Sequence, residues 1–238
     1  MAAGPWSKAA ALPELVRRLG ALDAALYAIA RLLGGISRGQ CRLLKYRFVA
    51  QPIPDADLSG IRPGGSFRVR QVAFEDPVVA RFPRPPAVIA RRFRDGARCF
   101  VAEAKGEFAG FLWLQHGGYD EDEVRCRFVP LPRQDTVWDF DVHLEPEQRM
   151  GRGFVRLWDA AMADLRQRRV RWTMSRISAF NADSLRAHAR LGAREVGSAT
   201  FLCAGTWQLA LFSSKPYVHF SRDDRSIPLL ELHAPPRE

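Results

Sequence analysis

The sequence predicts a mixed α/β fold of the α+β type, and two neighbouring segments carry this prediction. In the first, the apolar run 137–144 is typical of a strand, and a turn that contains Gly151 and Gly153 follows it. After the turn, apolar residues recur from Phe154 at i, i+3, i+4, i+7, i+8 and i+11. This is the spacing of an amphipathic helix. The first segment is therefore a strand, a turn and a helix.

The second segment repeats this order about thirty residues later. Residues 172–180 indicate a strand, although their alternation is imperfect. Asn181 then stands at a helix N-cap, where its side-chain oxygen can accept a hydrogen bond from a backbone N–H group. Gly192 stands where a helix end favours a left-handed residue.

The turn at 148–153 has the features of an anion site. Glycine lets the backbone approach a ligand closely, and the first N–H groups of the next helix point toward the turn. Arg149 and Arg152 add positive charge beside it. The turn therefore predicts binding of a phosphate group.

These motifs resemble those of the GCN5-related N-acetyltransferase (GNAT) superfamily. Gln148, Gly151 and Gly153 match the three positions of the family's pyrophosphate signature. Asn181 and Ser184 match the start of its next block, where His188 replaces the usual Tyr and Ala193 the usual aromatic residue. The specific motifs span 137–193, and the general layout extends over 66–213. The resemblance implies a mixed, mostly antiparallel sheet that is splayed in the middle and has helices on both faces.

The resemblance also implies acetyl-CoA or another acyl-CoA as the co-substrate. A main-chain amide at the end of the strand before the turn would polarise the acyl carbonyl. The residues expected to bind the co-substrate are Val142, His143, Leu144, Gln148, Arg149, Met150, Gly151, Arg152, Gly153, Phe154, Asn181 and Ser184.

Acyl transfer to an amine also requires that the attacking nitrogen be neutral. In strand 137–144, strict alternation places Asp139, Asp141 and His143 on one face and only apolar residues on the other. The two carboxylates are candidates to bind and deprotonate the amine, and Asp141 is preferred because it lies nearer the turn. The alternative is that the row is solvated or pairs with arginines. His188 can protonate the leaving thiolate if it is partly charged, or it can simply pack on its helix.

Composition limits the other classes of function. The chain has 238 residues, 47% hydrophobic and 26% charged, which is typical of a globular protein. Its net charge of +10 comes largely from arginine that is spread evenly along the chain, without the dense basic and aromatic tracts that bind nucleic acid. The four cysteines show no CxxC spacing, so we expect no metal site and no disulfide framework. A reducing cytoplasm fits this pattern.

We expect three regions along the chain: 1–64, 65–213 and 214–238. The first contains an amphipathic helix over 12–33, which Gly34-Gly35 would end, then a strand over 41–50 and a linker. Charged residues interrupt the helix, which excludes a membrane span or a signal peptide. It can pack on the domain or on a second subunit in a homodimer, lie on a membrane surface, or cover a long acyl chain.

The middle region is the expected acyltransferase domain. It should begin with strand 67–74 and a helix at 87–94, followed by a hairpin around Lys105-Gly106. Residues 117–134 form an insertion, and strands 194–203 and 206–212 close the domain. The C-terminal tail packs on the domain and includes a strand at 228–233.

The function expected from these observations is transfer of an acetyl or other acyl group from coenzyme A to a primary amine of a small molecule or a protein. Two alternatives remain open: a long-chain N-acyltransferase that uses acyl carrier protein, and a module that binds acyl-CoA without turnover. The sequence does not identify the acceptor amine.

Overall fold

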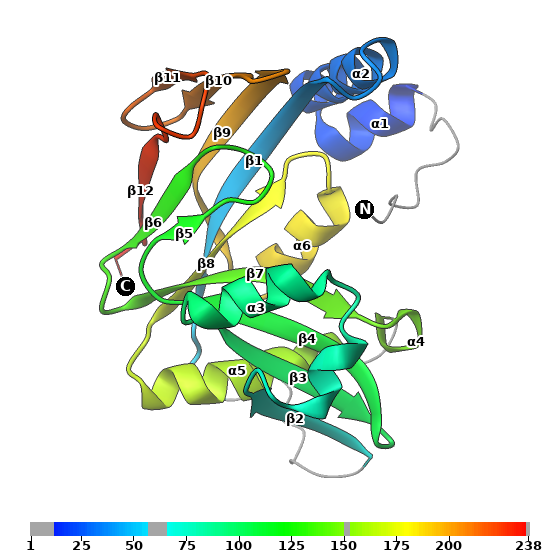
Figure 1. Ribbon diagram of the computed structural model, residues 1–238, viewed down its shortest axis with the longest axis vertical. Helices are drawn as coiled ribbons and strands as arrows, with labels where there is room; N and C mark the ends of the chain where they lie inside the picture. The colour runs from blue at the N-terminus through cyan, green and yellow to red at the C-terminus, as the bar shows by residue number, and fades with distance from the viewer. Residues whose placement is uncertain (1–11, 57–65, 150–152, 237–238) are drawn as a thin grey trace. The chain divides into compact units, whose positions relative to one another are not determined.

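The computed structural model describes residues 12–56, 66–149 and 153–236 (Figure 1). The chain divides into two compact units. The first comprises Met1–Val49, Asp120–Arg127 and Arg176–Leu230, and the second comprises Ala50–Tyr119, Phe128–Ser175 and Glu231–Glu238. This division follows packing, and the predicted boundaries at 64/65 and 213/214 stay predictions.

Most of the second unit's elements lie in the middle of the chain. They are β2 (Phe67–Val72), the 3-10 helix η1 (Pro77–Arg81), α3 (Pro86–Arg94), β3 (Arg98–Ala104), β4 (Glu107–Gln115), β7 (Thr136–Leu144), α4 (Pro146–Arg149) and α5 (Gly153–Gln167).

The first unit contains two N-terminal helices and the C-terminal strands. Its elements are α1 (Leu12–Leu19), α2 (Ala21–Ile36), α6 (Ala182–Arg190), β9 (Arg194–Ala204), β10 (Trp207–Phe212) and β11 (Val218–Ser221). Five strands begin in one unit and end in the other: β1 (Cys41–Pro52), β5 (Tyr119–Asp120), β6 (Arg127–Leu131), β8 (Trp172–Ser178) and β12 (Leu229–His233).

The strands confirm the predicted mixed, mostly antiparallel sheet. In the second unit their order is β8-β7-β4-β3-β2, and in the first it is β11-β10-β9-β1. The pairs β2–β3, β3–β4, β4–β7, β9–β10 and β10–β11 are antiparallel, whereas β7 and β8 are parallel from Thr136↔Trp172 to Trp138↔Met174. A separate small sheet has the order β12-β6-β5, so the predicted strand near the C-terminus is confirmed.

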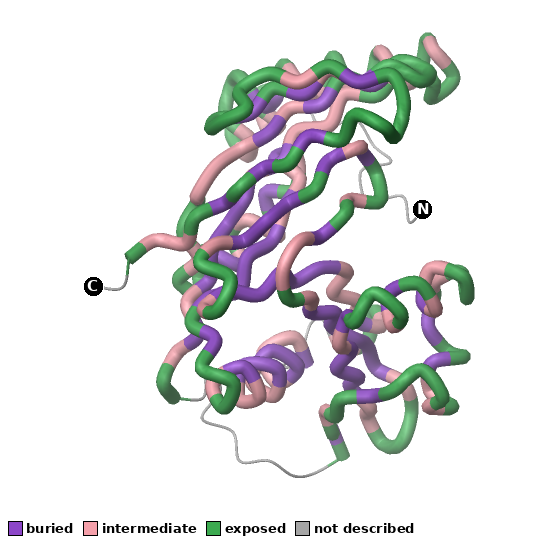
Figure 2. The backbone as a smooth tube through the Cα atoms, turned by 60° about the vertical axis from the view of Figure 1, so that its left-hand side comes forward, coloured by how far each residue is buried: buried purple, intermediate pink, exposed green. Residues whose placement is uncertain are grey.

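Helices cover both faces of the second unit's sheet, as predicted. The apolar side of α5 packs on one face, where Leu157, Trp158 and Met162 form a buried core with Leu112 and Leu114 of β4. On the other face, Phe93 of α3 packs edge-on against Trp113, with the ring centroids 4.9 Å apart. Figure 2 shows that buried residues follow the strands and this side of α5, while the connecting turns are mostly exposed.

Two predictions about the N-terminal helix were wrong. The helix does not run unbroken over 12–33, because Gly20 adopts a φ of 81° and separates α1 from α2. Only glycine takes this conformation without strain, so the chain can bend here by 117°. Gly34 and Gly35 do not end the helix either, since α2 continues to Ile36.

The local turn and cap predictions were confirmed. Lys105 and Gly106 both have positive φ angles, 53° and 83°, as a tight hairpin turn requires. The side chain of Asn181 caps α6, and Gly192 follows that helix with a φ of 81°. These features depend on neighbouring residues only.

Candidate active site

The end of β7 and the start of α5 form the segment with the predicted anion turn. α4 is a single helical turn that the sequence analysis did not predict, and it contains Gln148. Gly153 is the first residue of α5 and is buried. A Cβ atom at Gly153 would lie 3.1 Å from the carbonyl oxygen of Gln148 and 3.5 Å from the ring of Phe67. The close approach to Gln148 therefore favours glycine at this motif position.

The other turn residues are only partly described. Met150, Gly151 and Arg152 lie outside the described residues, and Arg149 is the last residue of α4. Phe154, in the first turn of α5, is half-buried and packs edge-on against Trp158, with their ring centroids 6.3 Å apart. The described N-terminus of α5 supplies the positive end of a helix dipole.

The predicted row of Asp139, Asp141 and His143 on one face is wrong. β4 pairs Phe111 with His143 and Trp113 with Phe140, so β7 contains one more residue than β4 over this stretch. The extra residue forms a β-bulge at Asp141, whose φ is 48°. The bulge resets the alternation of side chains. Asp139 consequently lies on the α5 face, paired with Leu114, while Asp141 and His143 lie on the α3 face.

Asp141 is held by two arginines, Arg84 and Arg92, so the alternative that the row pairs with arginines is confirmed for this residue. Nε of Arg84 donates to Oδ2 of Asp141 at 2.8 Å, and Arg92 of α3 donates to the same oxygen. Burial opposes ionisation of Asp141, but the hydrogen bonds and charges of Arg84 and Arg92 outweigh it and lower the pKa of the carboxyl. The guanidinium of Arg92 also lies over the rings of Trp113 and Phe140. Asp141 is therefore a structural anion in a cationic and aromatic cluster.

Asp139 has the opposite environment. It is only 3% exposed, and burial raises its pKa to about 7, although the hydroxyl groups of Thr173 and Ser175 act in the other direction. A carboxyl group of this kind changes its charge near neutral pH, as a general base should.

A further buried polar residue, Gln51, lies on the same face as Asp139. Ile53 N donates to Arg171 O at 2.9 Å between β1 and β8, which places Gln51 opposite Thr173 in this antiparallel pair. Thr173 in turn pairs with Val137 of β7. Both polar atoms of the Gln51 side chain are buried and have no hydrogen-bond partner among the described residues. The sequence analysis did not identify Gln51. The feature that could have identified it is a single polar residue inside the apolar run 48–53.

The remaining β7 candidates line the end of the strand. The His143 ring stacks on Phe108, and its Nε2 is 3.4 Å from Oε1 of Glu145. Val142 and Leu144 pack against the core under α5. Ordinary alternation places these two apolar residues on the face opposite His143, and all three precede α4.

The candidates Asn181, Ser184 and His188 belong to the first unit. Oδ1 of Asn181 accepts a hydrogen bond from the backbone N–H of Ser184 at 3.1 Å. His188 is buried, and its Nδ1 lies 2.9 Å from the carbonyl oxygen of Ser184, so Nδ1 carries a proton that it donates there. Burial lowers the pKa of His188, and the bond to Ser184 only partly offsets this. At neutral pH the ring is mostly uncharged.

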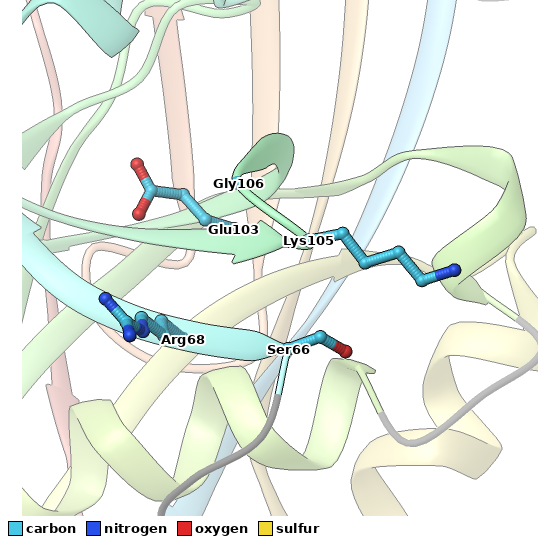
Figure 3. A pocket seen from close by; sticks show the side chains of 5 residues that line it. All are labelled: Ser66, Arg68, Glu103, Lys105 and Gly106. Carbon is cyan, nitrogen blue, oxygen red and sulfur yellow. The ribbon is translucent and has the colours of Figure 1, made fainter.

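Two hollows in the second unit lie apart from Asp139. One, of about 360 Å³, lies at the start of β2 and the β3–β4 turn and is lined by Ser66, Arg68, Glu103, Lys105 and Gly106 (Figure 3). The other, of about 460 Å³, lies along the segment from Phe74 to Ile89 and includes Arg84 in its wall. Through Arg84 the second hollow adjoins Asp141. This hollow lies on the α3 face, whereas Asp139 lies on the α5 face.

No protein-family model and no curated protein matches this sequence. Solved structures show a likeness to parts of the chain. A functionally unknown conserved protein from Staphylococcus epidermidis is 12% identical, with a TM-score of 0.47 over 71% of this chain and 64% of that one. A putative acetyltransferase of the GNAT family from Novosphingobium aromaticivorans is 19% identical, with a TM-score of 0.46 over 67% and 63%.

A putative acetyltransferase from Salmonella typhimurium, solved with its cofactor acetyl-CoA, is 16% identical, with a TM-score of 0.35 over 54% of this chain and 79% of that one. The chain spans less than two thirds of the length of the first two structures. At these identities and TM-scores, the likenesses do not assign an activity to this chain.

Proposed function

We propose that this protein is a GNAT-type N-acyltransferase that transfers an acyl group from coenzyme A to an amine. The observation that carries the proposal is the fit between motif and structure at Gly153. The family motif has glycine at this position. In the structure, a Cβ atom there would lie unusually close to the carbonyl oxygen of Gln148. The same position opens α5, the fifteen-residue helix that directly follows the β7–α4 segment.

The start of α5 would bind the pyrophosphate of coenzyme A. Its first N–H groups and the positive end of its dipole favour an anion, and Arg149 and Arg152 of the motif add charge. The acyl carbonyl would be polarised by a main-chain amide near the end of β7, among Val142–Leu144, next to the bulge. Bulges commonly re-aim the backbone beside active sites.

The structure changes which carboxylate is the better candidate for the base. Asp141 is already engaged by Arg84 and Arg92, which lower its pKa and make it a weak proton acceptor. Asp139, with a pKa of about 7, can accept a proton at neutral pH. In the proposed step the amine nitrogen attacks the thioester carbonyl, its proton passes to Asp139 directly or through water, the C–S bond breaks, and the thiolate leaves and is protonated.

Binding of coenzyme A to Gly153→Val tests the proposal. The added side chain should abolish binding, because it blocks approach to the start of α5. Gly34→Val is the matched control, since no atom lies within 4 Å of a Cβ at Gly34, and it should bind as the parent does. Calorimetry measures the affinity, and circular dichroism checks the fold.

Unchanged coenzyme A affinity in a folded Gly153→Val protein would refute the proposed site. Thiol release from acetyl-CoA, a long-chain acyl-CoA and acyl carrier protein, each with a panel of amines, then identifies the donor. Binding without turnover on every donor would instead identify a module that only holds acyl-CoA.

A further inference from the structure

Most buried polar side chains of the described chain have a protein partner. Gln208, which is 2% exposed, donates from Nε2 to the carbonyl oxygen of Arg125 at 2.7 Å, and its Oε1 accepts from the backbone N–H of Arg125 at 2.8 Å. Asp23 likewise binds Lys45 and Arg47. Such pairing is the rule in protein interiors, so a buried polar group without a partner requires an explanation.

A group of buried polar side chains in the second unit lacks such partners among the described residues. Gln51 of β1 is 1% exposed, and neither its amide nitrogen nor its amide oxygen has a hydrogen-bond partner there. The hydroxyl oxygens of Thr173 and Ser175 in β8 are also buried and unpaired. Gln51 lies opposite Thr173 in the β1–β8 pair, and Ser175 lies two residues further on the same side of β8.

The carboxyl group of Asp139 lies beside these side chains. Both hydroxyls are near enough to lower its pKa, although neither makes a direct hydrogen bond. The parallel pairing of β7 with β8 ends at Trp138↔Met174, so Asp139 and Ser175 are the next residues beyond the paired stretch. These four side chains, the Asp139 cluster, therefore lie together in the core where the two strands stop pairing.

The surroundings of the Asp139 cluster are apolar. Leu114 of β4 lies opposite Asp139, and the buried side of α5, which includes Trp158 and Met162, covers the same face of the sheet (Figure 1). Among the described residues no charged side chain contributes to the pKa of Asp139, which burial raises and the two hydroxyls lower. The polar atoms of the cluster thus have only one another to interact with in this part of the chain.

We propose that the Asp139 cluster binds one or more water molecules, which join Gln51 and the two hydroxyls to the Asp139 carboxyl group. Water fits because the site has both donors and acceptors: the amide and the hydroxyls can do both, and a carboxylate accepts. A buried water typically makes about three hydrogen bonds to groups that would otherwise be unpaired. A metal ion fits less well, since the amide N–H of Gln51 repels a cation and a single carboxylate is a poor ligand set.

The bound water makes Gln51 a positioning residue for the proposed acyl transfer, and this part of the inference rests on that proposed function. Asp139 is almost fully buried, so the proton of the attacking amine reaches it through water. One proton passes from the amine to a water molecule while another passes from that water to Asp139, and the water is unchanged. Water held by Gln51 also donates to the ionised carboxylate and stabilises the form that accepts the proton.

An NMR titration of the Asp139 carboxyl carbon tests the water site without any activity. The parent should titrate with a pKa of about 7. Gln51→Met keeps the size of the side chain but cannot hold the water, and it should raise this pKa by about 1 because the ionised form loses a donor. Thr173→Val removes a hydroxyl from the same site and should act in the same direction, which keeps the test open if Gln51→Met does not fold.

Gln208→Met is the matched control, because Gln208 is an equally buried glutamine in the first unit whose partners are backbone groups. It should lower stability and leave the titration of Asp139 unchanged. A crystal structure of the parent should show an ordered water within hydrogen-bond distance of Gln51 and of at least one hydroxyl. The water site is overturned if Gln51→Met and Thr173→Val titrate as the parent does, or if a cation occupies the cluster.

Turnover then tests the positioning role. Relative to the parent, Gln51→Met should lose about fivefold in kcat/KM at pH 7, the loss in ionised Asp139 that a pKa higher by about 1 produces, and should regain most of it above about pH 9. A loss of equal size at every pH would overturn the positioning role. A raised Asp139 pKa in both variants of a protein that turns over no acyl donor would support the water site and refute the proposed acyl transfer instead.

Discussion

The guanidinium of Arg84 donates a hydrogen bond from Nε to Oδ2 of Asp141 at 2.8 Å, although the two residues are 57 positions apart in the sequence. Arg92, 49 residues before Asp141, completes the arrangement. The three residues fix the β7 bulge to the segment that carries η1 and α3. Asp141 was proposed from the sequence as a proton acceptor. Its ion pairs with Arg84 and Arg92 instead explain its backbone conformation.

Asp141→Asn should lower the free energy of unfolding by about 2–3 kcal/mol at neutral pH. The substitution leaves Arg84 and Arg92 without their counter-ion, and the effect should fall below that of a fully buried pair because Arg84 is about a third exposed. Urea denaturation measures it. Asp183→Asn, at an exposed pair with Arg18, is the control and should cost at most about 1 kcal/mol.

The contribution of Asp141 to stability depends on pH. Because the pKa of Asp141 is lowered in the folded state, its stabilising contribution is present above the ordinary value of 3.8 and is lost as the pH falls through the folded pKa. The difference in stability between the parent and Asp141→Asn should therefore shrink toward acid. A difference that stays constant would contradict this assignment.

Asp139 should show the opposite behaviour. Its pKa of about 7 in the folded protein exceeds its ordinary value, so its contribution to stability falls as the pH rises from about 4 to about 7 and is level above that. Asp139→Asn should remove this dependence and be up to roughly 4 kcal/mol more stable than the parent at pH 8, since each pKa unit corresponds to about 1.4 kcal/mol. Urea titrations across this pH range measure it.

If Asp139 is also the base, Asp139→Asn should slow turnover at least about a hundredfold with little change in coenzyme A affinity. The parent kcat/KM should then rise with pH through about 7. A gain in stability with unchanged turnover would assign Asp139 a structural role only.

His188 offers a separate test of thiolate protonation. If it donates that proton, His188→Phe should lose ten- to a hundredfold in kcat, while His188→Tyr should keep much of the activity. Since burial lowers the pKa of His188, activity that depends on its charged form should increase as the pH falls below the ordinary value of 6.5. Equal rates for the parent and His188→Phe would leave His188 a packing residue with a bond to Ser184.

Asn181→Ala should destabilise the protein by about 1 kcal/mol, because it removes the N-cap hydrogen bond to Ser184. Asn181→Asp keeps an acceptor at the cap and is the control. If Asn181 also contacts the pantetheine arm of coenzyme A, Asn181→Ala should raise KM for the acyl donor, and Asn181→Asp should do so too despite its intact cap. Unchanged KM in both variants would limit Asn181 to capping.

The predictable parts of this fold are those that neighbouring residues determine. The α5 stripe, the Asn181 cap and the Lys105-Gly106 turn depend on spacing and on residues a few positions apart. The bulge at Asp141 was not predictable in this way, since a non-glycine residue with positive φ is stabilised here by arginines 57 and 49 residues away. The break at Gly20 had a visible signal, a glycine inside an apolar helical pattern, and was missed because the apolar spacing continues through it.

The same distinction applies to the candidate site. The motif identified Gly153, and packing around Gln148 explains why it is glycine. The difference between Asp139 and Asp141 is tertiary, because it comes from which sheet face each side chain enters. No sequence periodicity contains that information once a bulge changes the register.

The place of β1 between β8 and β9 has a consequence for how the protein is made on the ribosome. Ile53 bonds to Arg171, and Lys45 to Ala179, so β1 leaves the exit tunnel long before its partners exist. At typical synthesis rates of 5–20 residues per second, roughly 120 residues correspond to about 6–25 seconds. During this interval the nascent strand, with Phe48, Val49 and Ala50 destined for burial, has two unpaired edges. Newly made chains should therefore engage a holding chaperone until the C-terminal third emerges.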